Sequence, residues 1–224
     1  PQTTLAVNPA DPNGSGGWYK TTAPTITLTC ADDTSGCDKI YYKWDSDDYS
    51  EYTSSITAPE GDHTLSYYSK DKAGNSESVQ TKEFKVDTVA PTVTVDNLTT
   101  NDNTPQLTGT VDDSSATIQV TVNSANYSAT NNGDGTWTLA DGTISELADG
   151  TYDVAVSATD QAGNVGQDTT SDELVIDTQK PTISDFSAPV ADMVYKTDVL
   201  LKLTPSDTET AVSCSYKVDT GSSV

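Results

Sequence analysis

The sequence predicts an all-β protein made of antiparallel β-sandwiches arranged end to end, and three observations lead to this fold class. First, apolar residues recur with a period of two in short segments, and we find no helix-length stretch with a 3.6-residue period. Second, turn-forming phrases separate these segments about every 8 to 12 residues. Third, two phrases recur about one domain length apart, which indicates duplicated domains.

The expected strands are rich in Thr, Val, Ile and Tyr, which favour a pleated, half-buried backbone. They are TITLTC (25–30), KIYYKW (39–44), HTLSYYS (63–69), QLTGTV (106–111), TIQVTV (117–122), TYDVAVSAT (151–159) and ELVID (173–177). The phrases PEGD, NNGDG, LADG and AGN supply the turns, through glycines that allow positive φ and side chains that bond to nearby amides. In a unit of about 90 residues, this succession is typical of an immunoglobulin-like sandwich.

The repeated phrases set the domain boundaries. DKAGN, which begins at Asp71, returns as DQAGN at Asp160, 89 positions later. The phrase around Asp87, KVDTVAPTV, returns around Asp177 as VIDTQKPTI, 90 positions later. We therefore expect one domain at 1–88, a second at 89–178, and the N-terminal part of a third, incomplete one at 179–224, where SYKVD repeats the earlier YYKWD.

Composition narrows the classes of partner. The chain of 224 residues carries 11 basic and 34 acidic side chains, a net charge of −23, so nucleic acid and anionic membranes are poor partners and hard cations are the natural counterpart. No apolar run approaches the roughly 18 residues of a membrane span. Only 33% of residues are hydrophobic, which indicates thin cores between half-solvated sheets.

Two of the three cysteines are close in sequence. Cys30 and Cys37 are seven positions apart across a loop, and we expect a disulfide that fits an oxidising, extracytoplasmic setting; two free thiols are the alternative. Cys214 alternates with Tyr216 in CSYKVD and is expected to be a buried small residue of a strand.

At this point the sequence carries a family resemblance. In the second unit, DNTPQLTGTVDD, NNGDGTWTL, LADGTYDVAVSATDQAGNVG and LVIDTQKP resemble bacterial immunoglobulin-like repeats of large secreted and surface adhesins. In the first unit, TITLTCADDTSGCDKIYYKWD and GDHTLSYYSKDKAGN resemble a sister type of extracellular repeat. The resemblance covers nearly all of residues 20–219. It implies the sandwich fold, tandem arrays and an extracellular or cell-surface location, and it implies little about any particular ligand.

In this topology the DQAGN loop of the second unit faces the joint with the first. Asp160 would then lie near Asp87 of the joint and near Asp112 and Asp113 of the loop at 112–116, and such a gathering of carboxylates favours a bound cation. Ca²⁺ in proteins is bound by about six to eight oxygen ligands. We hypothesise that Asp87, Asp160 and one of Asp112 or Asp113 bind calcium with Asn164, and the resemblance implies the same because related adhesin arrays are stiffened by calcium at domain seams. The alternative needs no metal, since DxAGN is also the pattern of a simple Asx-type turn.

A second joint offers Asp177 together with Asp207, a less complete set of possible calcium ligands because no equivalent of the DQAGN loop follows it. At the first joint, only Thr-Val-Ala separates Asp87 from Pro91, which is too short for a flexible tether. Because proline fixes its own φ and biases the preceding residue to extended conformations, consecutive domains are expected to form a stiff rod.

Enzyme chemistry is not expected. His63 is the only histidine and lies at a predicted turn, so a Ser-His-Asp triad is improbable. The acidic residues fall in turns at domain ends, without an apolar cleft that would raise a pKa. The leading prediction is a non-catalytic extracellular protein, a rigid stalk or scaffold segment whose partners are neighbouring repeat domains.

Two alternatives stay open. A carbohydrate-binding accessory module would use solvent-facing tyrosines to stack on surface glycans; Tyr41, Tyr49 and Tyr52 are the candidates, and ordinary strand composition is the plainer explanation. In the other alternative, the incomplete third domain accepts a strand donated by an identical subunit and so builds a filament.

Overall fold

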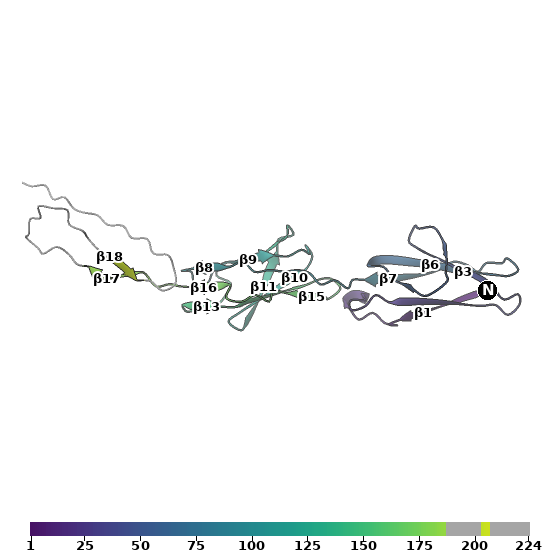
Figure 1. Cartoon of the computed structure of the whole chain (residues 1–224), viewed down its shortest axis with the longest axis horizontal. Helices are drawn as coiled ribbons and strands as arrows, with labels where there is room; N and C mark the ends of the chain where they lie inside the picture. Colours follow the sequence, from purple (N-terminus) through teal and green to yellow (C-terminus); the bar gives the residue numbers. More distant parts are fainter. Residues whose placement is uncertain (187–202, 207–224) are drawn as a thin grey trace, which may run out of the picture.

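The computed structural model describes residues 1–186 and 203–206, and within them the fold is all-β as predicted. The sole helical element of this part of the chain is a single 3₁₀ turn, η1 (Ser15–Gly17). Two sandwiches follow one another along the long axis of the molecule, the first purple to blue and the second teal to green (Figure 1). None of the helical segments among these residues has the length and apolar character needed to cross a membrane.

The first sandwich packs a three-stranded sheet, in the order β1-β2-β5, against a four-stranded sheet, in the order β4-β3-β6-β7. Its strands are β1 (Gln2–Asn8), β2 (Thr25–Ala31), β3 (Cys37–Trp44), β4 (Ser50–Glu51), β5 (Ile56–Thr57), β6 (Gly61–Asp71) and β7 (Gln80–Val86). All pairings within these sheets are antiparallel. The first and last strands, β1 and β7, thus belong to opposite sheets.

Alternation along β3 decides which side chains reach the core of the first sandwich. Ile40, Tyr42 and Trp44 pack against the buried cluster around Leu65 and Phe84, as the period-two pattern predicts. Cys30 at the end of β2 and Cys37 at the start of β3 form the predicted disulfide, which joins the two sheets at one end of the sandwich.

The second sandwich consists of a six-stranded sheet, in the order β15-β14-β10-β11-β12-β9, and a three-stranded sheet, in the order β13-β16-β8. Its strands are β8 (Leu98–Thr100), β9 (Leu107–Thr110), β10 (Thr117–Val122), β11 (Ala125–Asn131), β12 (Thr136–Leu139), β13 (Gly150–Tyr152), β14 (Val154–Thr159), β15 (Val165–Gln167) and β16 (Leu174–Ile176). The β11–β12 hairpin connects the two halves of the larger sheet.

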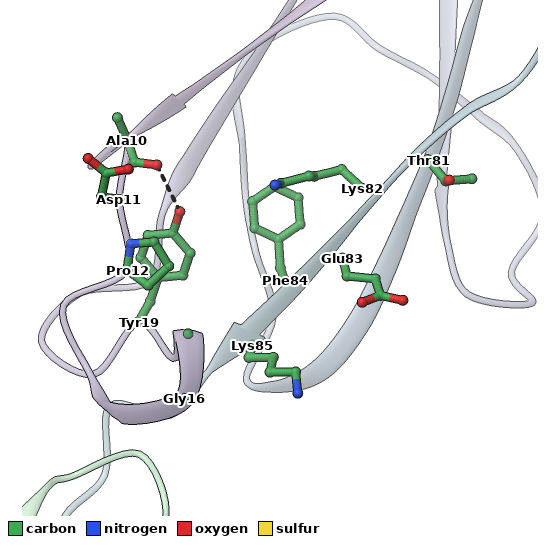
Figure 2. A pocket seen from close by; sticks show the side chains of 11 residues that line it. Ala10, Asp11, Pro12, Gly16, Tyr19, Thr81, Lys82, Glu83, Phe84 and Lys85 are labelled. Carbon is green, nitrogen blue, oxygen red and sulfur yellow. Dashed lines mark hydrogen bonds between the residues drawn. The ribbon is translucent and has the colours of Figure 1, made fainter.

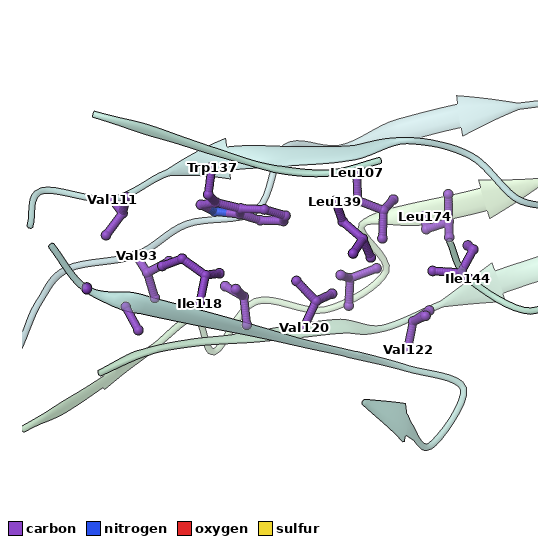
Figure 3. Close-up of a cluster of buried hydrophobic side chains, with 14 of the residues drawn as sticks. Val93, Leu107, Val111, Ile118, Val120, Val122, Trp137, Leu139, Ile144 and Leu174 are labelled. Carbon is purple, nitrogen blue, oxygen red and sulfur yellow. The ribbon is translucent and has the colours of Figure 1, made fainter. Parts of the chain in front are cut away.

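The core of the second sandwich is built around Trp137, which is 0% exposed (Figure 3). Its indole Nε1 donates a hydrogen bond of 2.8 Å to the carbonyl oxygen of Thr94, so the buried polar atom of the ring is satisfied. Gly109 lies beneath the ring on β9; a Cβ there would lie 1.9 Å from the Thr94 oxygen and 2.6 Å from Nε1. The absence of a side chain at position 109 therefore lets the tryptophan fill the core.

The segment TYDVAVSAT differs from the single strand that its pattern predicts. It divides at Asp153 into β13 and β14, which belong to different sheets. At the division, the amide of Val154 donates to the carboxyl Oε2 of buried Glu173 at 2.9 Å, a contact between residues 19 positions apart. A side chain that binds the backbone between the two strands accompanies the crossing of the chain to the other sheet.

Beyond the second sandwich, β17 (Thr182–Phe186) pairs antiparallel with β18 (Leu203–Ser206). The rest of the expected third unit, 179–224, falls outside the described residues, including Asp207 and Cys214. The expected strand-accepting role of this unit therefore stays a prediction.

Candidate functional site: the joint between the sandwiches

The linker leaves the first sandwich in a fixed geometry. The amide of Asp87 donates to the carbonyl oxygen of Tyr19 at 3.0 Å, and the Asp87 carboxylate accepts from the amide of Val89 at 3.2 Å. Thr88 donates both its amide, at 3.1 Å, and its hydroxyl to the carboxylate of Glu60 in the β5–β6 turn. Pro91, which follows, is buried. Asp87, Thr88 and Val89 are thus held by the first sandwich or by their own turn.

The second sandwich ends in the same way. Asp177 accepts from the amide of Gln179 at 3.0 Å, and Thr178 donates its amide at 2.8 Å and its hydroxyl at 2.7 Å to the carboxylate of Asp149. Because Asp149 lies 89 positions after Glu60 and Thr178 lies 90 after Thr88, the repeated phrase encodes a repeated structure.

Opposite the linker lies the loop of residues 160–164, called here the joint loop. The Asp160 carboxylate Oδ1 accepts from the amides of Gly163, at 2.7 Å, and Asn164, at 2.8 Å, while its Oδ2 accepts from Asn164 Nδ2 at 2.8 Å. Gly163 has a φ of 91°, a left-handed conformation that favours glycine. The phrase DxAGN therefore specifies a rigid turn, as the metal-free alternative expects.

This loop contacts the first sandwich and the linker at several points. Asn164 Nδ2 donates to the carbonyl oxygens of Asp87, at 2.9 Å, and Val89, at 3.3 Å. The carbonyl oxygen of Ala162, a residue that is 0% exposed, accepts from the amide of Ser15 at 2.9 Å. The loop does face backward to the joint, as its place in the topology predicts.

One charged side chain also crosses the joint. Lys20 of the first sandwich donates from Nζ to the carbonyl oxygen of Gly163 at 3.0 Å. Lys20 itself is held by Asn13, whose side-chain oxygen accepts from the Lys20 amide at 3.0 Å. The first sandwich therefore presents an ordered lysine to the acidic second sandwich.

Two glycines allow the backbones to meet this closely. A Cβ on Gly166 would lie 1.6 Å from the carbonyl oxygen of Pro91, and a Cβ on Gly14 would lie 2.6 Å from that of Ala162. Neither distance is compatible with a larger residue unless the backbone moves.

The predicted carboxylates line one hollow beside the joint. A surface concavity of about 320 Å³ is lined by Asp87, Val89, Ala90, Pro91, Asp112, Asp113 and Asp160. Asp112 Oδ1 accepts from the amide of Thr92 at 2.8 Å, and Asp113 Oδ1 accepts from the amide and hydroxyl of Ser115, each at 2.7 Å. Within the described part of the chain, the second carboxylate oxygens of Asp87, Asp112 and Asp113 accept no hydrogen bond.

The fit of this hollow to calcium is partial. Its carboxylate and carbonyl oxygens are the donors that calcium prefers. Over residues 1–186 and 203–206, however, no three acidic, cysteine or histidine side chains lie close enough together to hold a metal ion. Asn164 presents its nitrogen to the linker carbonyls, and both oxygens of Asp160 are used within the joint loop. The donor chemistry suits the ion, whereas the positions do not form a coordination shell.

The tyrosines divide into two environments. Tyr41 stacks on Tyr68 with ring centroids 5.3 Å apart, and Tyr49, 38% exposed, forms a T-shaped pair with Tyr68 at a centroid distance of 5.0 Å. Lys70 and Lys43 lie over the rings of Tyr41 and Tyr49 at 5.4 and 5.3 Å. This tyrosine–lysine cluster occupies the outer face of the β3–β6 pair.

Tyr52 is not part of the cluster. Its ring packs against Tyr42, and its hydroxyl accepts a hydrogen bond of 3.1 Å from the amide of Leu28. Tyr68 takes the place that sequence reasoning gave to Tyr52, because it is the cross-strand partner of Tyr41.

The single histidine lies near the start of β6 rather than in the predicted turn, and its side chain is partly buried. His63 Nδ1 lies 2.7 Å from Asp45 Oδ2, and Nε2 lies 2.7 Å from the carbonyl oxygen of Glu60. The hydrogen bond to Asp45 raises the pKa of His63 and lowers the pKa of Asp45. The pair connects the turn after β3 to β6.

A larger hollow of about 580 Å³ lies between the loop at 10–17 and the edge strand β7 (Figure 2). Tyr19 and Phe84 are buried residues of its wall, and the Tyr19 hydroxyl donates to the carbonyl oxygen of Ala10 at 3.3 Å. Lys82 and Lys85 of β7 line the same hollow. It lies behind the loop that contacts the second sandwich.

Sequence reasoning missed several residues of the joint, among them Ser15, Lys20, Glu60, Thr88 and Gly166. A signal existed for one pair, because Glu60-Gly61 and Asp149-Gly150 repeat 89 positions apart and precede the repeated Asp-Thr of each linker. Ser15 and Lys20 lie in a loop of the first unit with no repeated phrase, so nothing in the sequence pointed to them.

Comparison with known families agrees with this architecture. Residues 92–178 match the family described as bacterial Ig-like domain, and residues 48–131 match the bacterial Ig-like domain of group 3. The second match runs across the linker, from the later strands of the first sandwich into the earlier strands of the second. Residues 48–178 thus match bacterial Ig-like domains.

Among solved structures, the chain matches the fibronectin(III)-like modules of Clostridium thermocellum CbhA, at 16% identity over 77% of this chain and 94% of that one, with a TM-score of 0.35. A tetra-tandem repeat from the extending region of a large adhesion protein matches at 19% identity over 83% of this chain and 53% of that one, with a TM-score of 0.38. A Ca²⁺-stabilised, ice-binding adhesin of an Antarctic bacterium matches at 19% identity over 83% and 52%, with a TM-score of 0.34.

The chain therefore spans about half the length of those two adhesin structures. The search among curated proteins finds no match.

Proposed function

We propose that this chain is a rigid, non-catalytic segment of a bacterial surface or secreted protein, and that its work is to hold other parts of that protein at a fixed distance and direction. The observation that carries the proposal is the bridge from Asn164 Nδ2 to the carbonyl oxygens of Asp87 and Val89. A side chain that binds two linker carbonyls fixes the direction in which the second sandwich leaves the first. The disulfide between Cys30 and Cys37 supports an extracytoplasmic location.

The direct test is the relative motion of the two sandwiches. Residual dipolar couplings measured on the whole chain report one common alignment tensor if the joint is rigid and two different tensors if it pivots. We expect one tensor, together with an X-ray scattering curve of an elongated particle. Two independent alignment tensors, together with scattering that indicates a broad distribution of particle lengths, would contradict the proposed function.

We further propose that calcium stiffens the joint by binding in the hollow beside it. Support comes from the carboxylates of Asp87, Asp112 and Asp113, each with one oxygen that accepts no hydrogen bond within the described residues. Binding would require these side chains to turn inward, and it would offset the repulsion between them. Calorimetric titration of metal-free protein is expected to show binding that Asp87→Asn weakens and that the control Asp141→Asn, outside the hollow, leaves unchanged. Equal titrations for all three proteins would place the ion elsewhere, and no heat at all would exclude it.

A second candidate function rests on the tyrosine–lysine cluster. Its exposed member, Tyr49, forms a T-shaped pair with Tyr68, and tyrosine rings stack on sugars. If this face binds glycans, titration with surface polysaccharides is expected to show binding that Tyr49→Ala abolishes and Tyr127→Ala, on the other sandwich, preserves. A parent chain that binds no glycan would eliminate this candidate.

A further inference from the structure

We propose that the loop Asp71–Asn75, at the far end of the first sandwich, is a second docking surface of the same kind as the joint loop. Its partner is the end of another bacterial Ig-like sandwich, which presents an extended linker with accepting carbonyls. This inference rests on the proposed function, because it assumes that the joint between the sandwiches is a specific contact.

The two loops share the bonds between their first aspartate and their asparagine, and the amide of Gly163 donates in addition to the Asp160 carboxylate. Asp71 Oδ1 accepts from the amide of Asn75 at 2.8 Å, and Asp71 Oδ2 accepts from Asn75 Nδ2 at 2.9 Å. In the joint loop the corresponding distances, from Asn164 to Asp160, are 2.8 Å for both bonds. Gly74 has a φ of 92°, against 91° for Gly163. The loop at 71–75 therefore already has the shape that the joint loop has when docked.

The loops differ in what covers them. Ala162 is 0% exposed because the first sandwich packs on it, whereas Ala73 at the equivalent position is exposed. Asn164 Nδ2 reaches two linker carbonyls besides Asp160, whereas Asn75 Nδ2 donates only to Asp71 within the described part of the chain. The difference lies in the partner rather than in the loop.

The loop at 71–75 is also held in place by neighbouring residues of the first sandwich. The Cys30–Cys37 disulfide closes the neighbouring loop at 31–36, and the amide of Lys72 donates to the carbonyl oxygen of Gly36 at 3.0 Å. Pro1 precedes β1 at this end of the sandwich and stands 90 positions before Pro91, which occupies the same place before the second sandwich. The loop and the proline thus recur in both units, whereas the disulfide brace belongs to the first sandwich alone.

One difference between the ends matters for the contact. Where the second sandwich has Gly166, the first has Glu77, whose carboxylate accepts from the amide of Thr3 at 3.0 Å and from the amide of Ser69 at 2.7 Å. The first strand is held to the loop by a side chain here, whereas at Gly166 the backbones touch directly. Within the described residues, the Glu77 carboxylate accepts from Thr3, Ser69 and Gln80 and from no residue of the loop at 71–75.

The chemistry of the partner follows from the existing joint. It must offer two carbonyl oxygens two residues apart, as Asp87 and Val89 do, to Asn75 Nδ2. It must also place a lysine near the carbonyl oxygen of Gly74, as Lys20 is placed at Gly163. The second sandwich ends in the same Asp-Thr linker turn, so the linker recurs at the end of more than one sandwich, whereas the lysine is a feature of the first sandwich alone, because residues 89–178 contain no basic side chain.

The test fuses such a partner to the N-terminus of the whole chain. A second copy of residues 1–90 is added in front of Pro1, so that the new joint reads as the existing one does, and amide hydrogen exchange is followed in peptides covering 71–75 and 160–164. We expect exchange at 71–75 of the original copy to slow by about 10-fold and to approach that of the joint loop. Lys20→Ala in the added copy alone is expected to reverse part of this protection without touching the loop.

The outcomes separate this inference from the function on which it rests. If 71–75 exchanges equally fast in the extended and original chains while 160–164 stays protected, the second docking surface is excluded and the rigid joint stands. If neither loop is protected, the proposed function fails, and this inference fails with it. Exchange in the β6 peptides of both copies shows whether the added sandwich has folded.

Discussion

Replacement of Asn164 by alanine tests the joint at one side chain. The substitution removes Nδ2, which donates to the carbonyl oxygens of Asp87 and Val89 and to the carboxylate of Asp160. The first two bonds hold the sandwiches together, and the third belongs to the loop itself. The chain offers a matched control, because Asn75→Ala removes the equivalent loop bond, to Asp71, with no bond to another sandwich.

The expected magnitude follows from the two linker bonds. A hydrogen bond of this kind contributes about 1 kcal/mol net. The 2.9 Å bond to Asp87 should contribute that amount and the longer 3.3 Å bond to Val89 less, so we expect the docked joint to lose about 1 to 2 kcal/mol. Such a loss changes the ratio of docked to undocked joints by about 5- to 30-fold.

Residual dipolar couplings again provide the assay, with the alignment tensor of each sandwich fitted separately. In the parent chain and in Asn75→Ala the two tensors are expected to agree. In Asn164→Ala they should diverge, while each sandwich keeps its own internal couplings. If the tensors of Asn164→Ala still agree, the amide does not set the joint, and the reasoning from its hydrogen bonds is wrong.

Three further predictions concern packing and pH. Gly166→Ala would bring a Cβ to 1.6 Å from the Pro91 carbonyl oxygen, so thermal denaturation should show a loss of about 1 to 3 kcal/mol; an unchanged midpoint would contradict the close contact. Trp137→Ala removes a side chain that is 0% exposed and should lower the free energy of unfolding in urea by about 3 to 5 kcal/mol, and a loss under about 1 kcal/mol would show that the core collapses around the cavity. Burial raises the pKa of Glu77, but hydrogen bonds from Thr3 and Ser69 outweigh it and lower the pKa to about 2 from 4.5, so the carboxylate stabilises the fold above pH 4.5 and this contribution is lost as the pH falls towards 2. The gap in melting temperature between the parent and Glu77→Gln should therefore close over that range, and a constant gap would contradict the assignment.

The sequence predicts the strands well wherever alternation is regular. The inward positions of β3, the disulfide from Cys30 to Cys37, and the backward direction of the loop at Asp160 all follow from period, spacing and topology. These features depend on local pattern or on the order of strands in a sandwich, both of which a single sequence contains.

Features that depend on one side chain meeting a distant backbone could not be predicted. Glu173 binds the amide of Val154 where a regular strand pattern divides, and no local signal marks that contact. That Asn164 supplies an oxygen to calcium stays a prediction, and no sequence pattern indicated that its nitrogen donates to two carbonyl oxygens of the linker. The residue type was informative, but which end of its amide is used depends on a partner that only the folded joint supplies.

The charge distribution explains why a joint of this kind suits a chain of −23. Residues 89–178 contain fourteen acidic side chains and no basic one, so successive units repel each other and favour an extended arrangement. Repulsion alone sets no direction, because salt screens it over about 8 Å at physiological ionic strength and it acts on every orientation of the linker. Direction comes from short, directional bonds to the backbone, and Lys20 adds the positive charge that the second sandwich lacks. Because the bonds to the carbonyl oxygens of Asp87 and Val89 join uncharged groups, the orientation of the joint should persist at salt concentrations that abolish the repulsion.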